Sequence, residues 1–232
     1  MGGRAPRVAL LIPALNEEGA LPKVFAELPQ GIFSQIIVVD NGSTDRTAEL
    51  ARRSGATVVE EPRRGYGQAC LAGLAQVAPD TEIVVFLDAD GSDVPGEVQY
   101  LLEPILAGEA DFVIGSRLLG QAEPGALTWH QQWGNRLATR LVAWLFGFRY
   151  TDLGPFRAIR WARLQELGMQ DRNYGWTAEM QVKAIRRGLR VREVAVSYRR
   201  RLGRSKISGT VKGSLLAGAK ILWTIVRLRL AN

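Results

Sequence analysis

Two carboxylates separated by a single residue, in the segment Asp88-Ala89-Asp90, are the feature of this sequence best suited to chemistry. They follow the apolar run 83–87, which predicts a strand buried on both faces of a sheet. Parallel sheets bind ligands beyond the carboxyl ends of their strands, which is where this pair would lie. Both side chains would leave the strand on the same side if the chain stays extended.

The chemistry expected of such a pair is cation binding. Like charges this close repel one another, and a divalent cation is the usual means of keeping both ionised. Oxygen ligands suit Mg²⁺ or Mn²⁺, and a diphosphate would complete the coordination shell. A solvated acidic turn is the alternative interpretation, because a glycine and a serine follow directly.

The elements that must position this pair alternate along the first half of the chain. Strand and helix patterns at this spacing predict βαβ units and a mainly parallel sheet. The expected strands are the apolar runs 8–12, 36–39, 56–59, 83–87 and 112–114. The expected helices are the amphipathic stretches near 17–28, 44–54, 66–77 and 95–107.

The second half of the chain has a different pattern. Residues 156–160 alternate apolar and basic side chains, as an edge strand or an antiparallel strand would. Residues 177–187 predict a helix, and 191–198 predict another alternating strand.

Two late segments, 133–148 and 212–230, have the composition of helices that lie on a membrane surface. Each carries Trp and Leu along one helical stripe, with Arg or Lys around it. Neither reaches the ~18 uncharged apolar residues that a membrane-spanning helix needs. An ordinary helix that faces the core is the alternative interpretation for both segments.

Charge is divided unevenly along the 232 residues, whose net charge is +7. Residues 1–130 contain 9 Lys/Arg and 18 Asp/Glu, whereas 131–232 contain 21 Lys/Arg and 5 Asp/Glu. A basic half predicts an anionic partner: nucleic acid, anionic lipid or a phosphorylated substrate. No zinc-finger, RRM or KH signature is present, so we expect no nucleic acid partner. A single cysteine, Cys70, and a single histidine, His130, exclude an internal disulfide and a cysteine- or histidine-rich zinc site.

Polar groups also follow the first three expected strands. After the first, Pro13 is expected to stop the strand and Asn16 to cap the next helix. After the second, Asp40 can accept hydrogen bonds from a ribose or a base edge. After the third, Arg63 and Arg64 precede a glycine at a helix start, where they can meet phosphate. The absence of G-x-G-x-x-G and of a Walker sequence disfavours nicotinamide, flavin and P-loop functions.

The order of these segments resembles the family-2 inverting glycosyltransferases of the GT-A fold, and most closely the polyprenyl-phosphate sugar transferases such as dolichyl-phosphate mannose synthase. The matching segments are P-A-L-N-E-E, D-N-G-S-T-D, R-R-G-Y-G and D-A-D-G, followed by residues 151–158, 176–179 and 200–206. The resemblance implies a Rossmann-like α/β catalytic domain over 1–206, with helices on both faces of the sheet. Its nucleotide-binding half would be 1–117 and its acceptor half 118–206. Residues 207–232 would form a C-terminal amphipathic helix on the membrane surface.

The resemblance also implies roles for individual residues. Asp90 and Asp88 would bind Mg²⁺ or Mn²⁺ and act in catalysis together with Asp152 and Arg204. The nucleotide would be held by Pro13, Ala14, Asn16, Glu17, Asp40, Arg64, Gly65, Asp88 and Ala89. The acceptor and its phosphate would be held by Arg117, Arg200, Arg204, Ser205 and Lys206.

The expected reaction is the transfer of a sugar, with inversion, from a UDP- or GDP-linked donor to a polyprenyl phosphate at an anionic membrane surface. The metal would neutralise charge on the leaving diphosphate. A phosphate acceptor is ionised near neutral pH and needs no strong base. A hydroxyl acceptor would need one, and Asp152 is the candidate.

Three alternatives stay open on the sequence. The same fold can act on a hydroxyl acceptor, such as a glycan, a glycolipid or a small metabolite. A nucleotide- or lipid-binding protein without catalysis is the second. A sugar nucleotidyltransferase is the third and is disfavoured, because Pro13–Glu18 stands where those enzymes place a glycine-rich loop. With neither a secretory signal nor a spanning helix predicted, we expect a cytoplasmic protein, peripheral on the inner face of the cell membrane.

Overall fold

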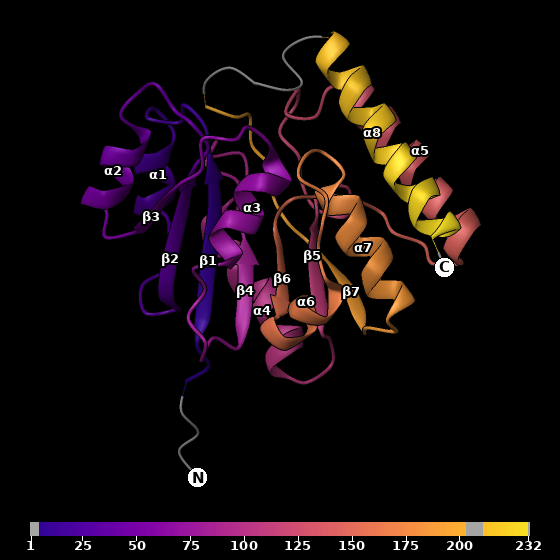
Figure 1. Ribbon diagram of the computed structural model, residues 1–232, viewed down its shortest axis with the longest axis horizontal. Helices are drawn as coiled ribbons and strands as arrows, with labels where there is room; N and C mark the ends of the chain where they lie inside the picture. The colour runs from indigo at the N-terminus through magenta and orange to yellow at the C-terminus, as the bar shows by residue number, and fades with distance from the viewer. Residues whose placement is uncertain (1–4, 203–210, 232) are drawn as a thin grey trace.

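A computed structural model of the protein describes residues 5–202 and 211–231, which form a seven-stranded sheet with helices on both faces (Figure 1). The strands are β1 (Val8–Ala14), β2 (Phe33–Asp40), β3 (Thr57–Glu60), β4 (Ile83–Phe86), β5 (Phe112–Ser116), β6 (Arg157–Arg160) and β7 (Val191–Ala195). Their order across the sheet is β3-β2-β1-β4-β6-β5-β7. The five strands expected in the first half of the chain are confirmed.

The helices also follow the expected order. They are α1 (Leu21–Ala26), α2 (Thr47–Arg53), α3 (Tyr66–Leu74), α4 (Val98–Leu106), α5 (Trp129–Phe146), α6 (Trp161–Leu167), α7 (Trp176–Arg186) and α8 (Val211–Leu230), with a short 3-10 helix, η1 (Pro95–Glu97), before α4. Helix α1 is shorter than the expected 17–28. Helix α6 was not expected: it begins directly after β6, with no turn residue between them to indicate a new element.

Strand β6 departs from one of the two placements considered for it. It is antiparallel, as one of them required, but it lies between β4 and β5 and not at an edge. The edge placement is wrong because Arg157, whose charge suggested exposure, is buried and donates hydrogen bonds to the carbonyl oxygens of Gly154 and Thr177. The edge strands are β3 and β7. Strand β7 pairs with β5 in parallel and ends at Ala195, before the expected 198.

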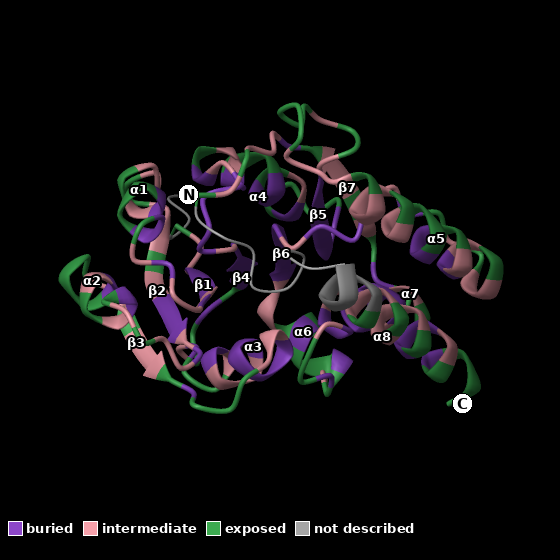
Figure 2. Ribbon diagram, turned by 90° about the horizontal axis from the view of Figure 1, so that it is seen from above, coloured by how far each residue is buried: buried purple, intermediate pink, exposed green. Residues whose placement is uncertain are grey.

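Each face of the sheet is covered by its own layer of helices (Figure 2). Helices α1, α2 and α4 pack on one face, and α3, α6 and α7 pack on the other. Strand β4 contributes to both layers, because Ile83 and Val85 join the first core while Val84 and Phe86 join the second. The expectation that this strand is buried on both faces is therefore confirmed.

Helices α5 and α8 lie side by side along the outside of α7 (Figures 1 and 2). Each buries one face in the core under α7, through Val142 of α5 and through Ile225 and Leu228 of α8. The guanidinium of Arg186 on α7 donates to the carbonyl oxygens of Leu228, at 2.6 Å, and Ala231, at 2.8 Å, and so satisfies the end of α8. Among the described residues, no helix combines the length and the apolar character needed to cross a membrane.

The two late segments expected to be helical, 133–148 and 212–230, are helical, although each helix begins before the expected residue. Helix α5 begins at Trp129, four residues before the expected 133, because Thr128 and Gln131 form a capping box. It ends at Phe146, where Gly147 takes the left-handed conformation with φ 73°. The boundary expected between a catalytic domain and the last helix, at 206/207, lies outside the described residues.

Candidate active site

A cavity of about 530 Å³ lies at the carboxyl ends of β1, β2 and β4. Strand β1 pairs in parallel with β2 on one side and with β4 on the other, so the cavity sits where the chain order of the sheet reverses. The expected site residues that line it are Pro13, Ala14, Glu17, Arg64, Gly65, Asp88, Ala89 and Asp90. The lining residues to which no individual role was assigned are Leu15, Asn41, Tyr66, Ala69, Asn173, Tyr174 and Arg201.

Strand β1 does not stop at Pro13, contrary to the expectation. Pro13 pairs with Val39 of β2, and the strand continues to Ala14. The pairing of β1 with β4 ends earlier, at Leu11. Pro13 therefore lies where the strand has one neighbour, a position that tolerates a residue without an N–H.

Asn16 does not cap α1, whose N-terminal cap is Ala20, so this expectation is also wrong. Its backbone is left-handed, with φ 52°, and its side-chain oxygen accepts a hydrogen bond from the backbone N of Thr44 at 2.7 Å. Asn16 thus joins the loop after β1 to the loop after β2. The carboxylate of Asp40 accepts from the backbone N of Ser43 at 3.1 Å in the same region. Asn16 and Asp40 support the walls of the cavity without lining it.

Asn41, directly after β2, organises the cavity wall beside the end of β1, where its backbone N donates to the carbonyl oxygen of Ala14 at 2.8 Å. Its side-chain amide donates to the carbonyl oxygens of Glu61, at 2.9 Å, and Arg63, at 2.7 Å, and its oxygen accepts from the backbone N of Gly65 at 2.8 Å. These bonds fix the loop that presents Arg64 to the cavity. The position of Asn41 in D-N-G-S-T-D, next to Asp40, was the only sequence signal for it.

The two carboxylates of the D-x-D segment both reach the cavity, although the chain turns at residues 89–90 instead of staying extended. Asp88 accepts a hydrogen bond from the hydroxyl of Tyr66 at 3.1 Å. Burial, followed by the charge of Asp90, raises the pKa of Asp88 to about 7, against the lowering effect of the Tyr66 bond. Asp90 accepts from the backbone N of Ser92 at 2.9 Å, and its other oxygen is paired with the guanidinium of Arg201.

Arg201 places a cation where a metal ion was expected. Its Nη2 pairs with the carboxylate of Asp90 and lies 3.9 Å from that of Glu17. The backbone before Arg201 runs along the D-x-D loop, where the N of Arg199 donates to the carbonyl oxygen of Ser92 at 2.7 Å. A guanidinium held by these carboxylates shows that their oxygens fit a cation, which supports Mg²⁺ or Mn²⁺ as a ligand. Within the described ranges, no group of three or more Asp, Glu, His or Cys side chains is placed to hold a metal ion.

Asp93, three residues after Asp90, is a further buried carboxyl next to this pair. It is 1% exposed, and neither of its oxygens meets a hydrogen-bond donor among the described residues. Burial, followed by the charges of Asp88 and Asp90, raises the pKa of Asp93 well above its ordinary value. The chain therefore holds two carboxyls whose ionisation opposes folding in the absence of a cation.

The metal-free protein is expected to lose stability as the pH rises from about 4 to about 7. In this window an unfolded Asp, with a pKa of 3.8, is already ionised, whereas folded Asp88 and Asp93 still bind protons. Each of these carboxyls lowers the free energy of unfolding by up to about 1.4 kcal/mol per pH unit. Urea unfolding in EDTA at several pH values measures the slope, and Asp93→Asn should make it shallower. An unchanged slope in the variant would contradict this account.

Asp152 and Arg117 form a buried ion pair beside the cavity and not within its lining. The guanidinium of Arg117 donates to both carboxylate oxygens of Asp152, at 2.7 Å each, and its backbone N donates to one of them at 2.9 Å. Burial raises the pKa of Asp152, but Arg117 outweighs it and the net shift is downward. The guanidinium carbon of Arg117 also lies 5.0 Å from the ring centre of Tyr198.

The expected acceptor residues after β7 are only partly described. Arg200 lies away from the cavity: its Nε donates to the carbonyl oxygen of Pro124 at 2.7 Å and its backbone N to Glu123 at 2.9 Å. Arg204, Ser205 and Lys206 lie outside the described residues. In the described part of the chain, the cavity is therefore lined by Arg201 and not by the expected Arg200.

Comparison with known proteins identifies the class to which this fold and cavity belong. Residues 9–168 match the family described as Glycosyl transferase family 2. The chain therefore belongs to glycosyl transferase family 2. An uncharacterized glycosyltransferase of Mycobacterium tuberculosis is 42% identical over 215 residues, which cover 90% of this chain and 94% of the relative.

Two further relatives carry more specific names. A dolichyl-phosphate hexose transferase of Haloferax volcanii is 32% identical over 90% of each chain. An undecaprenyl-phosphate mannosyltransferase of Micrococcus luteus is 30% identical, over 97% of this chain and 99% of its own. Among solved structures, glucosyl-3-phosphoglycerate synthase of M. tuberculosis in complex with Mn²⁺, UDP and phosphoglyceric acid is 25% identical, with a TM-score of 0.75, over 97% of this chain and 78% of that chain. The expected GT-A fold and family are confirmed.

Proposed function

We propose that this glycosyltransferase moves a sugar, with inversion, from a UDP- or GDP-linked donor to a polyprenyl phosphate at the inner face of the cell membrane. The observation that carries the proposal is the outer face of α5 and α8. It exposes Trp129 (79%), Trp133 (64%), Trp144 (81%) and Trp223 (58%) on helices that pack on the catalytic fold. Exposed tryptophans interspersed with arginines suit the boundary between lipid headgroups and acyl chains. The names of the H. volcanii and M. luteus relatives support a lipid phosphate acceptor.

The cavity supplies the donor side of this reaction. Loops after β1, β2 and β3 would hold the nucleoside, and Asp90 with Asp88 would hold Mg²⁺ or Mn²⁺. The bound metal supplies a Lewis acid that neutralises charge on the leaving diphosphate. Arg201 would exchange its bond with Asp90 for bonds to diphosphate oxygens, which guanidinium groups bind in a bidentate manner. Mn²⁺ and UDP in the M. tuberculosis synthase support this assignment.

The buried pair beside the cavity supplies the acceptor side. Asp152 holds the guanidinium of Arg117 in one orientation, so that its remaining N–H groups can meet a phosphate. Because Asp152 is bidentately paired and its pKa is lowered, it is a poor proton acceptor. This arrangement favours a phosphate nucleophile, which is already ionised, over a hydroxyl that needs a base.

The membrane part of the proposal predicts binding to anionic vesicles that weakens as salt is added. Trp144→Ser combined with Trp223→Ser should lower the affinity by at least roughly tenfold, because each buried indole contributes on the order of 1.5 kcal/mol. Leu106→Ser is the matched control, since Leu106 is 54% exposed on α4, in the layer opposite α7. Vesicle sedimentation at 50 and 500 mM salt measures the affinity and its salt dependence, because the screening length differs about threefold between the two conditions. Equal losses in both variants would contradict the assigned face.

Sugar transfer itself is tested with a panel of UDP- and GDP-sugars, in Mn²⁺, Mg²⁺ or EDTA. Undecaprenyl phosphate, dolichyl phosphate and phosphoglyceric acid are the acceptors. Metal-dependent transfer to a polyprenyl phosphate is the expected result and identifies the donor. Transfer to phosphoglyceric acid alone would replace the lipid by a small phosphorylated acceptor. Binding of a nucleotide with no transfer to any acceptor would leave the hydroxyl acceptors and the non-catalytic alternative.

A further inference from the structure

The loop between α6 and α7 forms part of the cavity wall and touches the nucleotide side of the site. Asn173 and Tyr174 of this loop line the cavity. Its backbone is in direct contact with the start of α3, where the N of Gln68 donates to the carbonyl oxygen of Arg172 at 2.9 Å. A Cβ on Gly67 would lie less than 3.0 Å from the backbone of the same loop. The two segments are therefore packed backbone to backbone, and a shift of the loop moves the cavity wall.

A single buried carboxylate, that of Asp171, ties this loop to α8. Its Oδ1 accepts from the backbone N of Asn173 at 2.8 Å and of Gly175 at 3.1 Å. Its Oδ2 lies 3.2 Å from Nζ of Lys220 and accepts from Oγ1 of Thr224 at 3.4 Å, and both of these residues belong to α8. The Asp171 side chain is 1% exposed, whereas that of Lys220 is 38% exposed, so the ion pair is buried on its acidic side.

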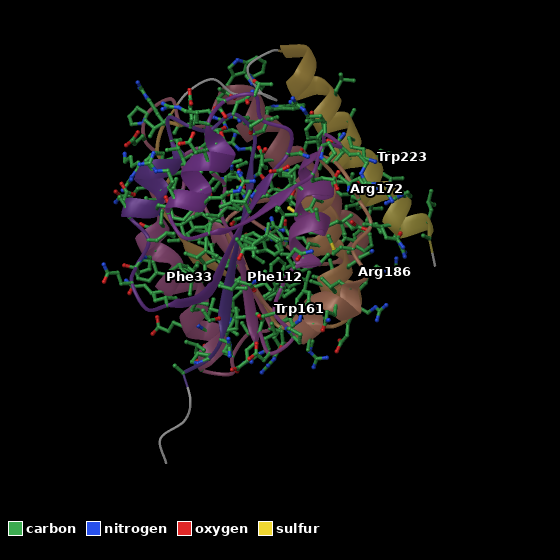
Figure 3. All side chains as sticks on the ribbon, turned by 60° about the vertical axis from the view of Figure 1, so that its left-hand side comes forward. Phe33, Phe112, Trp161, Arg172, Arg186 and Trp223 are labelled. Carbon is green, nitrogen blue, oxygen red and sulfur yellow. The ribbon has the colours of Figure 1, made fainter. Side chains whose placement is uncertain are left out.

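The contact between the α6–α7 loop and α8 is closely packed around Gly175. A Cβ on Gly175 would lie less than 3.0 Å from both Thr224 Oγ1 and the Asp171 carboxylate. Thr224 is fully buried, whereas its neighbour Trp223 is exposed on the outer face of α8. In Figure 3, Trp223 and Arg172 lie on the same side of the molecule. One turn of α8 thus contains both the exposed Trp223 and Thr224, whose hydroxyl is bonded to Asp171. Asp171 in turn holds the loop that forms the cavity wall.

From these contacts we infer that Asp171 is a positioning residue that couples the seating of α8 to the shape of the nucleotide cavity. The consequence for lipids rests on the proposed function: a membrane that engages the outer face of α8 favours the seated helix and thereby tightens nucleotide binding. By reciprocity, bound nucleotide strengthens the attachment to the membrane by the same factor. Such a link would restrict donor binding to protein that is already at its acceptor.

The test compares two variants of α8 that remove one positive charge each. Lys220→Met removes the partner of Asp171, whereas Arg227→Met removes an exposed cation on the same helix. Titration of UDP and of GDP, each with Mn²⁺ and without lipid, should show Lys220→Met binding at least roughly fivefold more weakly, the lower end of typical coupling, and Arg227→Met binding as the unaltered protein does. Thr224→Val removes the second bond without a charge change and should act in the same direction.

The second arm repeats the titrations with anionic phosphatidylglycerol vesicles. The unaltered protein and Arg227→Met should bind nucleotide at least roughly fivefold more tightly on vesicles, and Lys220→Met should show no such gain. Lipid-free affinities equal in all variants, or vesicles that bind the protein without changing its nucleotide affinity, would overturn the inference. Weakened nucleotide binding in Lys220→Met together with no vesicle binding by any variant would uphold Asp171 as the positioning residue and refute the membrane part of the proposed function.

Discussion

Asp90→Asn is expected to lower sugar transfer by roughly 10²- to 10⁴-fold, because a Lewis acid at the leaving diphosphate contributes several kcal/mol and each 1.4 kcal/mol is tenfold in rate. The amide keeps the shape of the side chain and its bond with the N of Ser92. It removes the charge that holds a cation, which in the structure is the guanidinium of Arg201. The loss should therefore lie in metal affinity as well as in turnover, and Mn²⁺ titration in the presence of UDP measures it separately.

A matched control for Asp90→Asn lies at the other end of the same strand. Asp80→Asn makes the same chemical change before β4, at a side chain that is half exposed and paired with Arg7. Surface ion pairs of this kind are worth about 0–1 kcal/mol, so transfer and metal affinity should stay near their original values. If Asp90→Asn retained Mn²⁺ affinity and transfer within a few fold, the D-x-D pair would not be the metal site.

The part of this site that sequence could predict is the part made by strand ends. Apolar runs locate β1, β2 and β4, and residues just beyond them, such as Pro13 and Asp88, line the cavity. The rule works because parallel strands end at one edge of the sheet, whatever else the chain does. Asn173 and Tyr174 line the same cavity from a loop far along the chain, and only tertiary packing on α3 brings them there.

The three consecutive arginines 199–201 show what pattern alone cannot resolve. They look equivalent in sequence, yet each has a different partner: Arg199 pairs with Glu27 at 2.7 Å, Arg200 bonds to Pro124 and Arg201 pairs with Asp90. The backbone of this segment is bonded to the D-x-D loop, with the N of Arg199 donating to the carbonyl oxygen of Ser92 and the N of Leu202 to that of Asp90, and this placement decides which arginine enters the cavity. Resemblance pointed to Arg200, whereas in the structure the lining residue is Arg201.

Asp152→Asn is expected to destabilise the protein by about 3–5 kcal/mol, because it leaves the guanidinium of Arg117, whose side chain is 15% exposed, buried without its counter-ion. The melting temperature should fall by roughly 6–20 °C for a chain of this length. Transfer should fall as well, since Arg117 loses the partner that orients it. Thermal unfolding and initial rates on the same preparation measure both effects.

Removing the second charge separates stability from chemistry. Arg117→Met combined with Asp152→Asn leaves no buried unpaired charge, so most of the lost stability should return. Transfer to a lipid phosphate should stay low, because the phosphate contact is gone while the fold is restored.

Arg117→Lys keeps the charge but not the planar fork, and it should lose transfer with a smaller loss of stability. If Asp152 were instead a general base, Arg117→Lys would retain most of the rate, and every variant without Asp152 would lose the acidic limb of its pH–rate profile. Arg117→Lys, which keeps Asp152, therefore distinguishes a carboxylate that positions a phosphate ligand from one that accepts a proton.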